Sequence, residues 1–260
     1  MDFPSVGATE NIILASCLAD GTTIINNAAM EPEIVDLVKY LNKMGAKIKG
    51  EGTNKITIIG VKKLKPASHN IMPDRIEVGT FLCATAATGG EVIIKNACPQ
   101  HVEAIVNKLE ECGCFIDIDG DTINLKAPKK LNSVEIKTTV YPGFPTDMQQ
   151  IFSASLLKAS GTSVIVENIF ENRYKYISEL RKMNTKIIQD GRVAIITGKR
   201  KIQAAELNCT DLRGGAALVI AALCAKGTSR IINIDYISRG YENFEEKLQK
   251  LGAKIKIMGN

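Results

Sequence analysis

The chain has 260 residues, of which 45% are hydrophobic and 23% charged, with a formal net charge of +5. This length allows one large domain or two modest ones, and the composition is ordinary for a soluble globular protein. Aromatic residues make up only 5% and no long basic run is present, which argues against a nucleic-acid-binding protein. A mild positive excess instead suits a small anionic substrate.

The N-terminal stretch, the apolar runs and the cysteines predict the cellular compartment of the protein. The stretch MDFPSVGATEN lacks the pattern of a signal peptide, and no apolar run reaches membrane-spanning length. The seven cysteines are odd in number, most lie in apolar runs, and neither a C-x-x-C pair nor a His-rich cluster is present to bind zinc. We therefore expect a soluble, cytoplasmic protein with reduced thiols and no metal site.

Four similar stretches follow one another along the chain, starting at Gly21, Gly90, Gly161 and Gly227. Each reads as a short β-branched strand, a loop, an amphipathic helix and then one or two strands. Apolar residues at helical spacing mark the helices in the first and last stretches: Ile34, Leu37, Val38, Leu41 and Met44; Tyr241, Phe244, Leu248 and Leu251. The helices are expected to end before Gly45, Gly113, Asn184 and Gly252. Turns between strands are predicted at EGTNK, DIDGD and QDGR.

A second, more apolar helix precedes each stretch, in ATENIILASCLADG, DRIEVGTFLCATAATGG, TDMQQIFSASLLKASG and TDLRGGAALVIAALCAKG. These helices are apolar nearly all round, so we expect them to be buried against one another with the sheets outside. The repeat is therefore helix, strand, helix, strand, strand, with a period of 66 to 71 residues. This pattern predicts an α/β fold built from repeats. It is not a Rossmann fold, because the chain has no G-x-G-x-x-G fingerprint.

The stretch KKLKPASHNIMPDR, Lys62 to Arg75, carries two prolines and separates the first repeat from the others. We place a domain boundary here, giving domains 1–72 and 73–260.

Three of the apolar helices begin with an aspartate, Asp74, Asp147 or Asp211. These are N-cap signals, and Glu77 and Gln150 stand at capping-box spacing from the first two. Helix N-termini gathered by the repeat symmetry would favour phosphate or carboxylate ligands. On spacing alone, each Asp is more simply a cap than a base.

Three arginines lie in loops at equivalent places of the repeats: Arg173 in FENRY, Arg213 in TDLRGG and Arg239 in YISRGY. Arginine suits the bidentate binding of phosphate and carboxylate, although a loop arginine is more often a solvated surface residue. Because these arginines and the helix starts fall at equivalent places in different repeats, together they favour a site that binds anions.

Several motifs together resemble those of the UDP-N-acetylglucosamine enolpyruvyl transferases (1-carboxyvinyltransferases, MurA): DFPSVGATENI, NAAMEPEIVDLVKYLNKMGAKIKGEGT, MPDRIEVGTF, FPTDMQ, FENRY, TDLR and RGYENFEEKLQKLGA. The resemblance covers essentially the whole chain. It implies an inside-out α/β barrel of two domains with three repeats each, of which four of the six are expected here. Residues 1–72 would be the last repeat of the UDP-sugar or catalytic domain, and residues 73–260 the second domain. The related 3-phosphoshikimate 1-carboxyvinyltransferases share this fold, but DFPSVGATEN and FPTDMQ favour the UDP-sugar enzyme.

The resemblance also implies an activity: transfer of the enolpyruvyl group from phosphoenolpyruvate to the 3′-hydroxyl of UDP-N-acetylglucosamine, with release of phosphate. This is the first committed step of peptidoglycan synthesis. No cofactor and no metal is implied, and neither nucleic acid nor membrane is an expected partner.

Roles for individual residues follow from the same resemblance. Asp147 would hydrogen-bond the sugar 3′-hydroxyl and act as general base. The UDP-sugar site would be lined or bordered by Phe3, Pro4, Ser5, Val6 and Gly7, and touched by the backbone of Ile169. Phosphoenolpyruvate would be contacted by Arg173, Arg213 and Arg239, with Arg239 also catalytic and Asp211 helping to arrange them.

Family members carry about two more repeats before DFPSVGATEN, including a Lys-Asn pair and a loop with a cysteine proton donor. None of the seven cysteines here has that context, so we expect a C-terminal portion lacking the catalytic-loop region. The chain is then either a half-enzyme that needs a complementary N-terminal fragment or an inactive remnant; a shikimate-pathway transferase is a third reading. Apolar helix surface at Ile12, Ile13 and Leu18 should be exposed in the first repeat.

Overall fold

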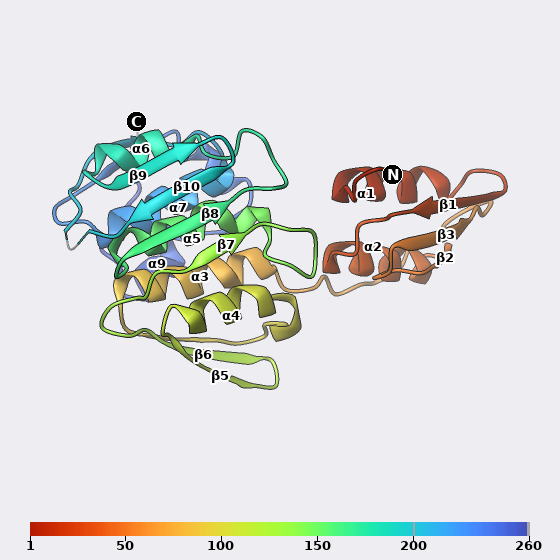
Figure 1. The fold of residues 1–260 in the computed structure, drawn as a ribbon. Helices are drawn as coiled ribbons and strands as arrows, with labels where there is room; N and C mark the ends of the chain where they lie inside the picture. Colours follow the sequence, from red (N-terminus) through yellow and green to blue (C-terminus); the bar gives the residue numbers. More distant parts are fainter. Residues whose placement is uncertain (200, 259–260) are drawn as a thin grey trace. The chain divides into compact units, whose positions relative to one another are not determined.

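The computed structural model describes residues 1–199 and 201–258. They form two compact units, each with its own hydrophobic cluster (Figure 1). Unit 1 is Met1–Pro73 with Val140–Gly143, and unit 2 is Asp74–Thr139 with Phe144–Asn260. Among the described residues, no helix has both the length and the apolar character needed to span a bilayer.

Unit 1 contains one complete repeat. Its elements are α1 (Val6–Ser16), β1 (Thr22–Asn26), α2 (Pro32–Lys43), β2 (Lys47–Lys49) and β3 (Lys55–Ile59). The strands form an antiparallel sheet in the order β1-β3-β2. Alternation along β1 and β3 directs Ile25, Ile56 and Ile58 into the core, where they meet Ile34 and Val38 of α2.

Unit 2 begins with a second repeat of the same order. Its elements are α3 (Arg75–Thr88), β4 (Glu91–Ile94), the 3₁₀ turn η1 (Pro99–His101), α4 (Glu103–Glu111), β5 (Phe115–Asp119) and β6 (Thr122–Lys126). The sheet order β4-β6-β5 repeats that of unit 1, and all pairs are antiparallel.

The third repeat gains one strand. It consists of β7 (Glu135–Lys137), η2 (Thr146–Met148), α5 (Gln149–Ser155), η3 (Leu156–Lys158), β8 (Thr162–Val166), α6 (Tyr176–Lys182), β9 (Lys186–Asp190) and β10 (Val193–Thr197). The order is β7-β8-β10-β9, with β7 parallel to β8. The fourth repeat has β11 (Glu206–Asn208), α7 (Leu212–Cys224), β12 (Arg230–Ile232), α8 (Asp235–Ser238) and α9 (Phe244–Lys250), and β11 pairs with β12 in parallel.

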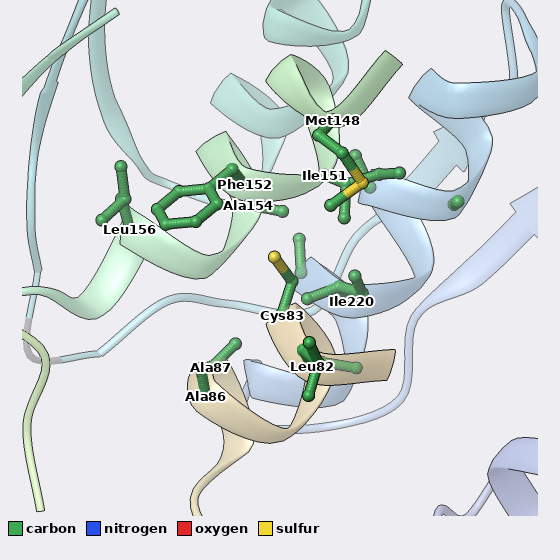
Figure 2. Packing of buried hydrophobic residues seen from close by; sticks show 14 of the residues in the cluster. Leu82, Cys83, Ala86, Ala87, Met148, Ile151, Phe152, Ala154, Leu156 and Ile220 are labelled. Atoms are coloured by element: carbon green, nitrogen blue, oxygen red, sulfur yellow. The ribbon is translucent and has the colours of Figure 1, made fainter. Parts of the chain in front are cut away.

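The apolar helices α3, α5 and α7 contact one another at the centre of unit 2. Figure 2 shows Cys83 of α3, Phe152 and Ala154 of α5 and Ile220 of α7 in this cluster, and each is at most 1% exposed. The prediction that these helices are buried against one another is therefore confirmed for unit 2. Small residues such as Cys83 and Ala154 let the helix backbones approach closely.

The predicted helix ends and hairpins are also found. Gly45, Gly113, Gly252 and Asn184 all have positive φ just beyond a helix, the left-handed conformation that ends helices. The stretches EGTNK, DIDGD and QDGR connect β2 to β3, β5 to β6 and β9 to β10.

Three details differ from the sequence-based expectations. Residues 253–258 form no strand, so the fourth repeat has no hairpin after its helix within the described residues. Leu251 lies beyond the end of α9 and is exposed. In α1, Ile13 is fully buried, contrary to the expectation, because α1 turns the Ile13 side toward α2 and the sheet of unit 1. Leu18, just beyond α1, is exposed as expected.

Candidate active site around Asp147

Asp147 lies in η2, one turn before α5, in unit 2. The residue at the N-cap of α5 is Met148 and that of η2 is Pro145, and neither makes a side-chain cap hydrogen bond. The prediction that Asp147 caps this helix is therefore wrong. The chain enters α5 through the 3₁₀ turn η2, and Asp147 lies within this turn. Its carboxylate therefore contacts residues outside α5.

Those partners are two arginines. Arg173 Nη2 donates to one carboxylate oxygen of Asp147, and Arg213 Nε donates to the other at 3.1 Å. The side chains of Arg213 and Arg173 are 13% and 20% exposed, and that of Asp147 is 39% exposed. Burial alone would raise the pKa of Asp147, but the two guanidinium groups outweigh it and lower that pKa below its ordinary value. The carboxylate is therefore ionised at neutral pH.

The fold of α7 places Arg213. Asp211 is the N-cap of this helix, and its Oδ1 accepts from the backbone N–H of Gly214 at 2.8 Å. The same oxygen accepts from Gln150 Nε2 at 3.2 Å, which ties α5 to the start of α7. The cap formed by Asp211 thus holds Arg213 in the first turn of α7. Gln150 hydrogen-bonds Asp211 and does not complete a capping box with Asp147.

Asp74 caps α3 as predicted, accepting from the N–H groups of Ile76 and Glu77 at 2.7 and 3.1 Å. The Glu77 side chain does not complete a capping box there, because it pairs with Lys247 of α9 at 2.6 Å. Of the three aspartates that begin a helix, only Asp147 directs its carboxylate to arginines.

Aromatic rings hold both guanidinium groups in place. Arg213 Cζ lies 5.3 Å from the ring centroid of Tyr241, and Arg173 Cζ lies 5.1 Å from that of Phe170. Two nitrogens of this pair, Arg173 Nε and Arg213 Nη1, are buried without an acceptor among the described residues. Buried N–H groups normally have a partner, so the site retains capacity for a further acceptor.

A buried glutamate organises the loop beside Asp147. Glu167, at the end of β8, is 1% exposed and accepts from the hydroxyls of Thr138 and Thr146 at 2.8 and 3.0 Å. It also accepts from the backbone N–H groups of Ile169 and Phe170 at 2.9 and 3.2 Å. One carboxylate therefore fixes both the segment that carries Asp147 and the loop that carries Ile169.

Arg239 and residues 3–7 complete the set of residues predicted for the site. Arg239, at the C-cap of α8, is exposed, with its guanidinium 5.4 Å from the ring centroid of Tyr236. Ser5 caps α1 in unit 1, accepting from the N–H of Ala8 at 3.3 Å. Around it, Phe3 and Gly7 are exposed, and Pro4 and Val6 are partly exposed.

Sequence reasoning missed Glu167, and it missed Gln150 and Tyr241 as neighbours of the site. Glu167 had a usable signal, since it directly follows the β-branched run TSVIV and so ends a strand. Gln150 and Tyr241 had none, because their roles depend on partners far away in the sequence.

Nothing in the described part of the chain suggests a metal centre, since it contains no group of three or more potential metal ligands. All seven cysteines are free thiols. Burial raises the pKa of Cys114 and of Cys209 to about 11, so both are protonated at neutral pH.

Comparison with known proteins shows which family the chain belongs to. Residues 1–248 match the family model of EPSP synthase (3-phosphoshikimate 1-carboxyvinyltransferase). The chain is 54% identical over 255 residues to UDP-N-acetylglucosamine 1-carboxyvinyltransferase 1 of Caldanaerobacter subterraneus subsp. tengcongensis, and 52% identical to UDP-N-acetylglucosamine 1-carboxyvinyltransferase 2 of Geobacillus kaustophilus. Each match covers 98% of this chain but only 61% and 60% of the relative. The chain therefore spans about three fifths of the length of these relatives.

Solved structures agree on the fold. The enolpyruvyl transferase NikO from Streptomyces tendae is 27% identical with a TM-score of 0.86, covering 96% of this chain and 60% of that one. EPSP synthase from Acinetobacter baumannii is 20% identical with a TM-score of 0.73, covering 99% and 62%. On the family match and this shared fold, the chain belongs to the EPSP synthase family of 1-carboxyvinyltransferases.

Proposed function

We propose that this chain provides the base and the anion-binding arginines of a UDP-N-acetylglucosamine 1-carboxyvinyltransferase. Such an enzyme transfers the enolpyruvyl group of phosphoenolpyruvate to the sugar 3′-hydroxyl and releases phosphate, as in peptidoglycan synthesis. Identities of 54% and 52% to enzymes of that name favour this acceptor over shikimate 3-phosphate. With seven free thiols in the chain, we place the reaction in the cytoplasm.

The observation that carries the proposal is the Asp147 cluster. An ionised carboxylate lies between two arginines, each of which keeps one buried nitrogen without an acceptor. Phosphoenolpyruvate carries a phosphate and a carboxylate, the groups that guanidinium binds best. Arg173 and Arg213 would bind this substrate, and Arg239, two residues before Tyr241, would join them from the α8 turn.

The chemistry assigns Asp147 a proton-transfer role. The sugar 3′-hydroxyl adds to C2 of phosphoenolpyruvate as Asp147 takes the hydroxyl proton. C3 receives a proton from the cysteine donor that the resemblance implies for the N-terminal portion of the enzyme. The C2–O bond to phosphate then breaks, C3 returns a proton to that donor, the phosphate leaves with the original hydroxyl proton, and the enol ether forms. While two guanidinium groups occupy Asp147, its low pKa makes it a weak base. An incoming anion that draws Arg173 and Arg213 away would raise this pKa and make Asp147 a stronger base.

The other predicted contacts complete the proposal. Ser5, Val6 and Gly7, with Phe3 and Pro4 beside them, would contact the UDP-sugar, as would the backbone of Ile169, which Glu167 fixes. Asp211 would act by holding the start of α7 and with it Arg213. Residues 1–72 are then the last repeat of the UDP-sugar domain and residues 73–260 the second domain.

The test measures phosphate release from phosphoenolpyruvate with UDP-N-acetylglucosamine. The chain is assayed alone and together with the part of the Caldanaerobacter relative that it does not match. We expect Asp147→Asn to lower the rate by about 10²- to 10⁴-fold, the usual contribution of a general base. Asp74→Asn is the matched control, because Asn caps a helix as well as Asp and the rate should persist.

Phosphate release that requires shikimate 3-phosphate in place of the UDP-sugar would assign the chain to the other branch of the family. An undiminished rate for Asp147→Asn would remove the base role. No release under any of these conditions would favour an inactive remnant.

A further inference from the structure

Glu167 is a buried carboxylate that takes no part in the proposed proton transfer. It directly follows β8 and is 1% exposed. Removing a carboxylate from water costs free energy unless hydrogen-bond donors replace the water. Glu167 has four such donors, and they come from three separate segments of the chain. Its carboxylate therefore fixes the positions of these segments relative to one another.

The two oxygens of this carboxylate divide the donors. Oε1 accepts from the hydroxyl of Thr138 at 2.8 Å and from the N–H groups of Ile169 and Phe170 at 2.9 and 3.2 Å. Oε2 accepts from the hydroxyl of Thr146 at 3.0 Å. The Thr138 hydroxyl accepts in turn from the N–H of Asn168 at 2.9 Å. Three successive backbone N–H groups of the loop after β8 thus have their acceptors in one network.

One side of this network holds the segment that carries Asp147. Thr146 and Asp147 are neighbours in the 3₁₀ turn η2. A single 3₁₀ turn has poorer internal hydrogen bonds than an α-helix, so its position depends more on contacts with the rest of the fold. The hydrogen bond from Thr146 to Glu167 is such a contact, and it ties η2 to the end of β8.

The other side of the network holds the loop that carries Arg173. The N–H of Phe170 donates to Glu167, and the ring of Phe170 lies 5.1 Å from Arg173 Cζ. Arg173 in turn donates to the carboxylate of Asp147. The hydrogen bonds of Glu167 therefore reach both partners of the ion pair between Asp147 and Arg173.

We propose that Glu167 is a positioning residue, which holds η2 and the Arg173 loop so that Asp147 and Arg173 meet. Its effect on rate rests on the proposed function, whereas its effect on the ion pair does not. Glu167 binds backbone N–H groups of the loop, so the Arg173 guanidinium can turn from Asp147 to a substrate anion while the loop stays in place. A carboxylate suits this role because its two oxygens accept from several donors at once.

A double-mutant cycle tests the positioning without an assay of activity. Urea denaturation at pH 7 gives the stability of the full chain as wild type, Asp147→Asn, Glu167→Ala and the double variant. We expect the loss caused by Asp147→Asn to shrink by about half or more in the Glu167→Ala background, because coupled residues are not additive. If Glu167→Ala does not fold, Thr146→Val gives the same cycle, since it removes only the hydroxyl on the Asp147 side.

The rate of phosphate release gives a second readout, with the unmatched part of the Caldanaerobacter relative added. Glu167→Ala should lower kcat/KM for phosphoenolpyruvate by about 10²-fold, the scale of the loss when a catalytic group is misplaced by an ångström. Glu167→Gln should keep most of the wild-type rate. Its amide oxygen can accept from the three donors at Oε1, and its amide nitrogen can donate to the Thr146 hydroxyl.

Ser163→Ala is the matched control. Ser163 lies near the start of β8, the strand that Glu167 follows, and is also 1% exposed. Its hydroxyl oxygen accepts from the backbone N–H of Val134 at 3.2 Å, so the variant removes a buried hydrogen bond between a side chain and the backbone. We expect it to lower stability, to add to Asp147→Asn in a cycle and to leave the rate unchanged.

Additive effects of Glu167→Ala and Asp147→Asn, like those expected for Ser163→Ala, would overturn the proposal. An equal loss of rate in Glu167→Gln and Glu167→Ala would also overturn it, because the retained hydrogen bonds would then not matter. If the wild type shows no turnover, the proposed function fails, and the double-mutant cycle still decides whether Glu167 positions Asp147.

Discussion

At the scale of single residues, three aspartates that all stand at the predicted start of a helix have two different kinds of partner. Asp74 and Asp211 accept from backbone N–H groups at the start of a helix, whereas the carboxylate of Asp147 accepts from Arg173 and Arg213. An aspartate that only caps a helix can be replaced by asparagine with little loss, but a carboxylate between two guanidinium groups is held as an anion. This difference makes Asp147 the chemically distinctive member of the set.

The ionisation of Asp147 gives a pH-dependent prediction. Its pKa in the folded chain lies below the ordinary value of 3.8. A carboxylate with a lowered pKa stabilises the fold fully above its unfolded pKa, and this contribution is lost as the pH falls through the folded pKa. Asp147→Asn should therefore lower the free energy of unfolding by about 1 kcal/mol at pH 7, a modest value because the partly exposed pair is screened by solvent.

Urea titrations at pH 7 and pH 3 measure this effect, and the gap between wild type and variant should narrow at the lower pH. A gap of equal size at both pH values would show that the charge of Asp147 does not contribute to stability.

At the scale of elements, the packing of α3, α5 and α7 sets the stability of unit 2. Phe152 of α5 is fully buried, and its ring meets that of Phe144 edge-on at a centroid distance of 5.5 Å. Phe152→Ala should lower the free energy of unfolding by about 3–5 kcal/mol, because it removes buried surface and leaves a cavity.

Phe115 provides the matched comparison. It lies on β5 in the same unit and is 69% exposed. Phe115→Ala should change stability by no more than about 0.5 kcal/mol. Chemical denaturation of the two variants gives both values, and comparable losses would contradict the central role of the three helices.

At the scale of the whole molecule, residues 1–199 and 201–258 form two hydrophobic clusters that share no residue. Units with separate cores need not unfold together. Ile58 is fully buried in unit 1, and the next residue, Ile59, is 47% exposed. Ile58→Ala should speed hydrogen exchange in β1, β3 and α2 while leaving α7 unchanged, and Ile59→Ala should have little effect on either unit.

Hydrogen exchange read by mass spectrometry resolves the two units directly. Equal loss of protection in α2 and α7 on Ile58→Ala would show that the units unfold as one.

Much of the architecture follows from local patterns. Apolar periodicity predicted the helices, and β-branched runs predicted most strands. Residues such as Gly45 and Asn184 predicted where helices end. These features can be predicted because each depends on the conformational preferences of a few neighbouring residues. Among the described residues no strand follows α9, although one was expected after this helix, because a strand needs a partner and its own sequence cannot provide one.

The sequence by itself determined the repeats, the buried helices and the family motifs, all of which are recorded in short, regular stretches. Only the tertiary structure decided which charges meet. Arg173 and Arg213 are 26 and 66 residues from Asp147, and no local rule pairs them. The tertiary structure also decided that Ile13 is inside and Leu14 outside, because the side of α1 facing α2 depends on packing across the unit. Contacts between distant residues arise from how the elements pack, and that packing defines both the site around Asp147 and the side of α1 that is exposed.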